Sequence, residues 1–240
     1  MTNFLKVKLP AAVAIVALAS YCVFLEVQAS QDSDEQIGPL AAWNPGDKDL
    51  QQINDGCRSR DPADYSQCFT DRMEELGASP EAIDFAEQYA KEHDGAIAVL
   101  TDFQPADAVD VGYAYFPDRH ESTQSVLLLN GTPEILNIGD PKELPQEQLT
   151  SNAQFAALRR AHPQVAIFPG NGVQPDARPR MQKLADGGQR FVMDYSFRDG
   201  CNSCALLGQA TFAFDFDSAG QFRGAILVKV KAENTPGFNK

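Results

Sequence analysis

The chain has 240 residues, 43% of them hydrophobic, and carries a formal net charge of −13 at pH 7. This length is enough to bury one substantial core, so a single folded domain is the simplest organisation. Affinity for nucleic acids and for anionic lipid surfaces depends on Lys and Arg side chains that neutralise phosphate. The acidic balance, with no basic stripe in the sequence, therefore disfavours both kinds of partner.

The first 29 residues have the layout of a secretory signal peptide. Lys6 and Lys8 form a short positive flank, an apolar run follows over residues 9–25, and Val27–Ala29 supplies small residues at the cleavage positions. We expect cleavage after Ala29 and a periplasmic or secreted location for the rest of the chain.

Two alternatives keep the N-terminal segment on the mature protein. The run 9–25 is at the short end of what crosses a bilayer, so an uncleaved anchor in the inner membrane stays open. Cys22 would be the acylated residue of a lipoprotein, but the bulky Tyr21 stands where a small residue is required. In each case the lysines favour a cytoplasmic N-terminus and an exported body. Membrane contact is expected only through this segment.

Residues 30–52 are polar, acidic and interrupted by glycine and proline. This composition predicts a flexible acidic leader, followed by a single α+β domain over residues 53–240. Trp43 is the exception within the leader. It either docks on the surface of the domain or contacts a partner.

A helical hairpin is predicted at the start of the domain. The pair Asp61-Pro62 supplies an N-cap and a proline at the first helical position, and Gly77 ends the first helix. The pair Ser79-Pro80 starts a second helix in the same way, and Gly95 ends it. Apolar residues recur at spacings of three and four in both segments, so each helix has one face for the core.

Beyond residue 96 the apolar pattern changes to the alternation typical of strands. Residues 109–116 alternate, and residues 125–138 form two apolar runs around Asn130-Gly131. Asn-Gly between strands predicts a two-residue type I′ hairpin, because both residues tolerate positive φ. The same asparagine begins a glycosylation acceptor sequence that ends at Thr132, but the turn already accounts for it.

The segment 139–188 has a weaker pattern. One helix is predicted before Pro163, followed by a short strand at residues 165–168 and a long irregular connection over residues 169–188. Long connections of this kind often carry function.

The last third of the chain has the clearest strands. Residues 189–197, 210–216 and 221–231 alternate, so each strand has one core face and one wet face. In the third strand we expect four residues to face the core together: Phe222, Ile226, Val228 and Val230. A tight turn at 217–220 joins the last two strands. The whole pattern predicts an α+β fold, in which the N-terminal helical hairpin packs on a mostly antiparallel β-sheet built from two meanders.

Four cysteines lie beyond the export segment: Cys57, Cys68, Cys201 and Cys204. An even number in an oxidising compartment favours two disulfides. Cysteines that are close in sequence pair without closing a long loop. We therefore predict the pairs Cys57–Cys68 and Cys201–Cys204.

The sequence Cys201-x-x-Cys204 also fits a redox pair or half of a metal site. A redox pair of the thioredoxin type begins a long helix, whose dipole makes the first thiol reactive. Here a glycine, Gly208, follows soon after Cys204 and a strand comes next, which leaves no room for such a helix. A structural disulfide is the preferred interpretation, and a redox-active pair is the alternative.

No metal, cofactor or catalytic group is predicted elsewhere. Three histidines share no ligand spacing: His93, His120 and His162. The segment that starts at Asp215 resembles the opening of a calcium loop, but Ile226 occupies the position of the bidentate glutamate, so a hairpin turn is favoured. The charged segment 118–121 combines acid, base and histidine, for which a solvated loop is the simpler explanation.

The run DGCxxC…LG…FxFDFDxxGxF, which begins at Asp199, resembles uncharacterised exported proteins of Gram-negative bacteria. The likeness covers residues 189–231 best and the helical hairpin more loosely. It implies a location in the cell envelope and no particular activity. We therefore expect a non-catalytic binding protein whose partner is another envelope protein or a small ligand. The alternative hypothesis is a thiol–disulfide redox protein that uses Cys201 and Cys204.

Overall fold

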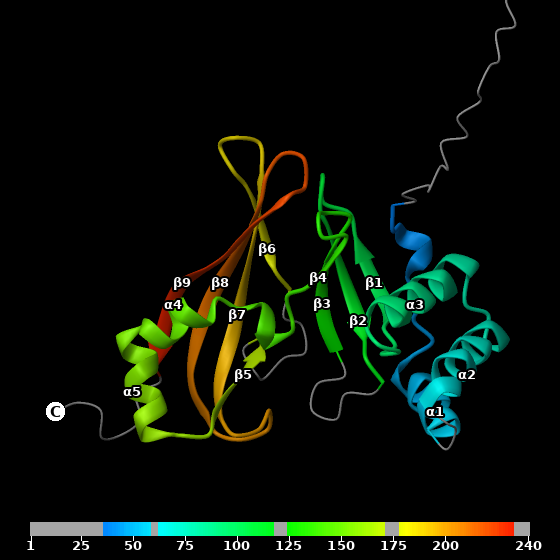
Figure 1. Ribbon diagram of the computed structural model, residues 1–240, viewed down its shortest axis with the longest axis horizontal. Helices are drawn as coiled ribbons and strands as arrows, with labels where there is room; N and C mark the ends of the chain where they lie inside the picture. The colour runs from blue at the N-terminus through cyan, green and yellow to red at the C-terminus, as the bar shows by residue number, and fades with distance from the viewer. Residues whose placement is uncertain (1–35, 59–61, 118–123, 171–177, 233–240) are drawn as a thin grey trace, which may run out of the picture. The chain divides into compact units, whose positions relative to one another are not determined.

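The computed structural model describes residues 36–58, 62–117, 124–170 and 178–232 (Figure 1). The predicted signal peptide, the start of the predicted leader, Asp61 and the charged segment 118–121 with His120 lie outside these ranges. The described residues belong to one folded unit that starts at Gln36.

Helices and strands follow one another in four groups. The first contains the 3-10 helix η1 (Pro39–Ala41) and the helices α1 (Asp47–Cys57), α2 (Pro62–Glu75) and α3 (Pro80–Glu92). The second is a sheet of β1 (Val99–Gln104), β2 (Asp110–Tyr115), β3 (Gln124–Leu129) and β4 (Ile135–Asn137). The third contains η2 (Pro141–Glu143), α4 (Gln146–Ser151) and α5 (Ala153–Ala161). The fourth is a sheet of β5 (Val165–Pro169), β6 (Arg180–Lys183), β7 (Gln189–Asp199), β8 (Leu206–Phe216) and β9 (Phe222–Ala232).

The α+β class is confirmed, and the two predicted meanders form two separate antiparallel sheets. The first sheet has the order β1-β2-β3-β4, in which each strand pairs with the next along the chain. The second has the order β5-β7-β8-β9, and β6 also pairs with β7. Since β8 occupies one edge of β7, β5 and β6 share its other edge.

The first sheet is buried on both faces. Leu127 and Leu129 of β3 lie in one core with Phe85 of α3. Val126 and Leu128, which point the other way, lie in a second core with the aromatic residues of β7 and β8. A strand that is covered on both sides needs a continuous apolar run, and this is the sequence of β3.

The second sheet turns its aromatic face toward this shared core. Phe212, Phe214 and Phe216 of β8 have no exposed surface. The helix α5 extends the cover of this face, because Phe155 packs against Phe197 of β7 with ring centroids 4.9 Å apart. Charged side chains occupy the opposite face of the sheet, which remains on the solvent side.

The predicted leader is wrong for residues 36–52. The backbone N–H of Trp43 donates to the carbonyl oxygen of Leu100 in β1 at 2.7 Å, and α1 begins at Asp47. Trp43 packs against the helical core. Of its two predicted roles, the structure therefore confirms docking on the domain. The acidic composition suggested a disordered segment, but Leu50 is buried in the helical core, and tertiary packing of this kind stabilises short helices.

The predicted two-residue turn at Asn130-Gly131 is also wrong. Leu129 pairs with Ile135, so the connection runs over residues 130–134. Asn130 does have positive φ (64°), but its side chain binds both the N–H and the carbonyl oxygen of Ile37. A contact with a segment that is distant in sequence therefore determines the conformation of this loop.

Three further elements were missing from the sequence-based prediction. Polar residues in β1 hide its alternation, and all four residues of β6, within the predicted irregular connection, are exposed. The single helix predicted before Pro163 is two helices, because Asn152 ends α4 and its side chain caps α5.

Candidate functional site

Both disulfides join the cysteines that the sequence favours as partners. The Cα atoms are 5.8 Å apart in Cys57–Cys68 and 5.1 Å apart in Cys201–Cys204. Both distances lie in the usual range for a disulfide. The surroundings of the two bonds differ, and this difference decides which of them can react.

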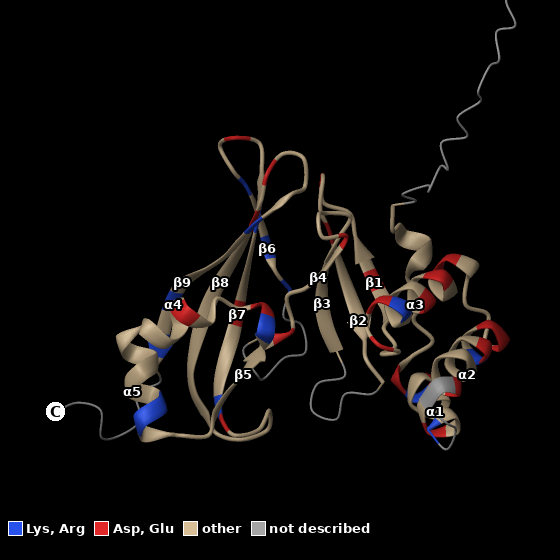
Figure 2. Ribbon diagram, in the orientation of Figure 1, with Lys and Arg blue, Asp and Glu red and all other residues tan. Residues whose placement is uncertain are grey.

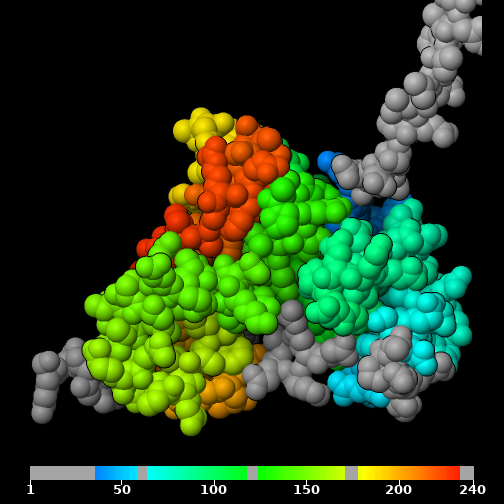
Figure 3. Space-filling view, in the orientation of Figure 1, coloured from blue at the N-terminus to red at the C-terminus, as the bar shows by residue number. Residues whose placement is uncertain are grey.

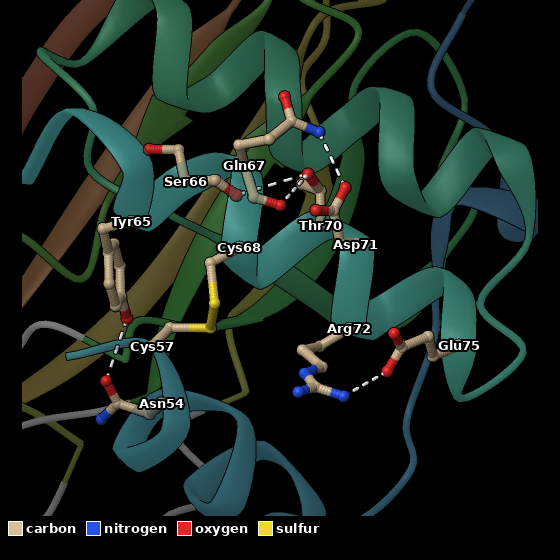
Figure 4. Close-up of a disulfide and its surroundings, with 10 residues drawn as sticks. All are labelled: Asn54, Cys57, Tyr65, Ser66, Gln67, Cys68, Thr70, Asp71, Arg72 and Glu75. Atoms are coloured by element: carbon tan, nitrogen blue, oxygen red, sulfur yellow. Dashed lines mark hydrogen bonds and ion pairs between the residues drawn. A yellow bond between two sulfur atoms is a disulfide. The ribbon is translucent and has the colours of Figure 1, made fainter. Parts of the chain in front are cut away.

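The Cys57–Cys68 disulfide lies inside the helical core, where it links the end of α1 to α2 (Figure 4). Cys57 is 0% and Cys68 is 5% exposed. Beside it the hydroxyl of Tyr65 donates to Asn54 at 2.9 Å, and the amide of Asn54 donates to the carbonyl oxygen of Pro117 at 3.1 Å. These contacts tie two helices to the end of β2, so this disulfide has a structural role.

The Cys201–Cys204 disulfide lies in the turn between β7 and β8, where both cysteines are partly exposed. The N–H of Cys204 donates to the carbonyl oxygen of Cys201 at 3.0 Å, and the N–H of Asp199 donates to that of Ala205 at 3.1 Å. Strand β8 begins directly afterwards, at Leu206. The hairpin is therefore closed by hydrogen bonds as well as by the disulfide, and neither cysteine begins a helix.

Two charged or polar side chains contact this turn. Arg198, only 7% exposed, donates from Nη1 to the carbonyl oxygen of Cys204 at 2.7 Å. His162, at the end of α5, places Nδ1 3.6 Å from a carboxylate oxygen of Asp199. The guanidinium of Arg198 therefore brings positive charge to the backbone of the turn. Because both cysteines are partly exposed, this disulfide can undergo thiol–disulfide exchange.

The remaining residues that the sequence singled out have structural roles where they are described. His93 stacks on Tyr89 with ring centroids 3.8 Å apart. Asp215 accepts two hydrogen bonds of 2.6 Å from Arg190. The side chain of Asp217 accepts from the N–H groups of Ala219 and Gln221, which confirms the predicted hairpin turn at residues 217–220. Among the described residues, no group of three or more His, Cys, Asp or Glu side chains is placed to hold a metal ion.

The solvent face of the second sheet carries a network of charged pairs that the sequence did not indicate. Arg180 donates to Asp194 at 3.1 Å, and the hydroxyl of Thr211 donates to the same carboxylate at 2.6 Å. Burial opposes ionisation of Asp194, but these hydrogen bonds and the charges of Arg180 and Lys229 hold its pKa below the usual value. The carboxylates on this face are thus satisfied by arginines of neighbouring strands.

A second candidate site lies on β9, the last strand of this sheet. We define the β9 strip as four exposed residues: Ile226, Val228, Lys229 and Lys231. Ile226 is 38% and Val228 55% exposed. Neither lysine forms an ion pair with another described residue. In the space-filling view the red residues of β9 reach the surface near α4 (Figure 3).

Ile226 and Val228 do not face the core as the sequence pattern predicted. The pairing of β8 with β9 shifts register twice, between Thr211 and Phe212 and between Asp215 and Phe216. Ile226 therefore pairs with Ala213, which points away from the phenylalanines of β8. A β-bulge adds one residue to a strand and redirects the side chains beyond it. Simple alternation carries no signal for such a shift.

Comparison with known proteins finds no match, whether among protein-family models, curated proteins or solved structures. The resemblance to uncharacterised exported proteins therefore remains a prediction. Within the described ranges no helix is long and apolar enough to cross a membrane. The described residues offer two candidate sites, a partly exposed disulfide and an exposed apolar strip that ends in two lysines.

Proposed function

We propose that the protein is exported to the cell envelope and acts there as a non-catalytic interaction protein that binds its partner through the β9 strip. The observation that carries this proposal is the exposure of Ile226 and Val228 next to two lysines that form no ion pair with another described residue. Exposed apolar side chains with a charged rim are typical of protein interfaces. A strand surface offers a small ligand little enclosure, so another envelope protein fits the strip better.

Two features support the proposed location. The first 29 residues have the three-part pattern of a signal peptide. Two disulfides form in the folded chain, and disulfides persist in the periplasm and outside the cell. Intact mass after export from a Gram-negative host tests this part of the proposal. Loss of residues 1–29 and of four hydrogen atoms is expected, whereas retention of the apolar run would indicate the membrane-anchored alternative.

The binding function is tested by photo-crosslinking in the exporting host. A photoreactive amino acid replaces Val228 in one strain and Lys91, an exposed residue of α3, in a matched control strain. We expect a discrete adduct from position 228, its loss when Lys229→Glu and Lys231→Glu are added, and none from position 91. Equal adducts from both positions, or none from position 228, would contradict the proposal.

A thiol–disulfide function is the second candidate, favoured by the solvent exposure of Cys201 and Cys204. In the reduced protein one thiolate would attack a substrate disulfide and form a mixed disulfide. The second thiolate would then release the substrate as a dithiol, so that two electrons pass to the substrate and Cys201–Cys204 forms again.

The redox candidate is tested by alkylation and mass analysis across a glutathione redox series. Opening of Cys201–Cys204 alone near about −200 mV, together with a mixed disulfide trapped by Cys204→Ser, would favour the redox function. Resistance of both disulfides until strongly reducing conditions would exclude it and leave the binding function.

A further inference from the structure

Charge is distributed unevenly along the folded unit. Residues 36–117 contain 16 Asp and Glu but 5 Lys and Arg, whereas residues 178–232 contain 8 Lys and Arg but 5 Asp and Glu. The carboxylates lie along α1, α2 and α3, as Figure 2 shows. Two ion pairs, Lys183–Asp107 and Arg178–Asp102, join the regions beside the first sheet. The carboxylates of the helices and the lysines of β9 take no part in these pairs, and charges act over only about 8 Å at physiological ionic strength, so they form local surfaces of opposite sign.

The acidic region contains its own exposed apolar residues. Leu40 is 64% and Leu76 is 52% exposed. The hydroxyl of Ser79 donates to the carbonyl oxygen of Leu40 at 2.6 Å, which holds η1 against the turn that follows Leu76. Glu74 and Glu81 are exposed on either side of this turn and form no ion pair with another described residue. We call Leu40, Leu76, Glu74 and Glu81 the α2–α3 patch.

The exposed apolar residues of the described chain therefore gather in two places. They are Leu40, Leu76, Met181, Ile226 and Val228. All but Met181 belong to the α2–α3 patch or to the β9 strip. The α2–α3 patch combines two leucines with two exposed glutamates, and the β9 strip combines two apolar residues with two exposed lysines. None of these four charged residues forms an ion pair with another described residue. The two surfaces are thus complementary in charge and similar in apolar content.

The two sites cannot meet within one molecule. The helices pack on one face of the first sheet, and the second sheet packs on its other face (Figure 1). The β9 strip lies on the solvent face of the second sheet, because Lys229 pairs with Thr211 and Lys231 with Gln209. Both sheets stand between the strip and the α2–α3 patch, so a contact between these sites requires two molecules.

We propose that the β9 strip of one protomer binds the α2–α3 patch of a second copy of the chain. Lys229 and Lys231 would face Glu74 and Glu81, while Ile226 and Val228 would cover the two leucines. This inference rests on the proposed function, since it assigns the interaction surface a partner. The contact uses a different surface on each protomer, so it generates rings or open chains.

Side-chain contact fits β9 better than strand addition. The N–H of Leu227 donates to the side-chain oxygen of Gln148 in α4 at 2.9 Å, which occupies the free edge of the strand. Two register shifts interrupt the pairing of β9 with β8, and the strand itself carries Lys229 and Lys231. Natural sheets use such bulges, covers and lysines to prevent edge-to-edge pairing. The exposed face of the strand remains available.

Sedimentation velocity of the exported, processed chain tests this inference. We expect concentration-dependent association at an ionic strength of about 0.02 M that weakens at about 0.5 M, because the contact includes exposed charge pairs. The double variants Lys229→Glu/Lys231→Glu and Glu74→Lys/Glu81→Lys should each associate at least about tenfold more weakly. A mixture of the two should associate again, because each reversed surface then meets a complementary one.

A matched control distinguishes the effect of the two sites on association from an effect of net charge alone. Lys48→Glu/Lys91→Glu makes the same change in net charge on exposed residues outside both sites and should leave association unchanged. A monomer at every ionic strength, or a mixture that stays monomeric, would overturn the inference. If the chain is monomeric but position 228 still crosslinks to another protein in cells, only self-association fails. If neither is observed, the proposed function fails as well.

Discussion

Cys57–Cys68 joins two helices in a core that leaves 0% and 5% of the cysteines exposed, whereas Cys201–Cys204 closes the turn of a hairpin whose cysteines reach solvent. The first disulfide lies where α1 depends on packing for its stability. The second lies where hydrogen bonds from Asp199, Arg198 and Cys204 already close the turn. The comparison shows that the same bond can be a necessary part of a core or an addition to a preformed turn.

The largest expected difference between the two disulfides is in their reduction rates. With dithiothreitol under native conditions, Cys201–Cys204 should open at least about a thousandfold faster, since a buried bond reacts only after local or global unfolding. Timed alkylation and peptide mass analysis measure both rates. Comparable rates would mean that the helical region opens easily, and would remove the basis for distinguishing the two bonds.

Removal of the buried disulfide should cost the most stability. Cys57→Ala/Cys68→Ala should lower the free energy of unfolding by about 3 kcal/mol, the loop-entropy value for cysteines at this spacing. Urea unfolding followed by fluorescence of Trp43 is suited to this measurement, because Trp43 is the only tryptophan of the chain and packs on this core. A loss below about 1 kcal/mol would contradict the structural role.

Removal of the exposed disulfide should have a smaller effect. Cys201→Ala/Cys204→Ala should cost at most about 2 kcal/mol, because the closed loop is shorter and the hydrogen bonds of the turn remain. The circular dichroism spectrum should be unchanged. A larger loss would show that the bond is needed to form the β7–β8 hairpin, and would weaken the case for a redox function.

Arg198 tests whether hydrogen bonding to the turn protects the Cys201–Cys204 disulfide from reduction. Arg198→Met keeps much of the side-chain volume but removes the donor to Cys204. It should cost about 1 kcal/mol, the usual net contribution of one hydrogen bond, and should speed reduction of Cys201–Cys204 severalfold. An unchanged reduction rate would mean that Arg198 does not support the turn.

The smallest effect is expected at Asp194, on the same strand but away from the turn. Its pKa is lowered from 3.8, so its stabilising effect is present above about pH 4 and is lost as the pH falls through its lower folded value. Asp194→Asn should therefore cost less than about 1 kcal/mol at pH 7, and less still as the pH falls below the folded pKa. Reduction of Cys201–Cys204 should be unaffected, which makes this variant a control for Arg198→Met.

Local signals in the sequence predicted the helices and strands that depend on near neighbours. Ser79 caps α3 with Pro80 at its first position, as predicted, and its side chain accepts from the N–H of Ala82. Strands β7 and β8 follow their aromatic alternation. Both cysteine pairs follow from short spacing. In these cases the residues that determine the structure lie close in sequence, at most 11 positions apart for the cysteine pairs, so the pattern is visible in one dimension.

Tertiary contacts decided the features that the sequence left open or indicated wrongly. Helix α1 forms in an acidic segment because Leu50 enters the helical core, and the Asn130 loop is held by Ile37. The direction of Ile226 and Val228 depends on how β9 pairs with β8 and on Gln148 of α4. The sequence by itself determined an α+β chain with two disulfides, one of them in the connection between two strands. The exposed β9 strip exists only in the folded protein, because bulges arise from strand pairing and no local residue pattern specifies them.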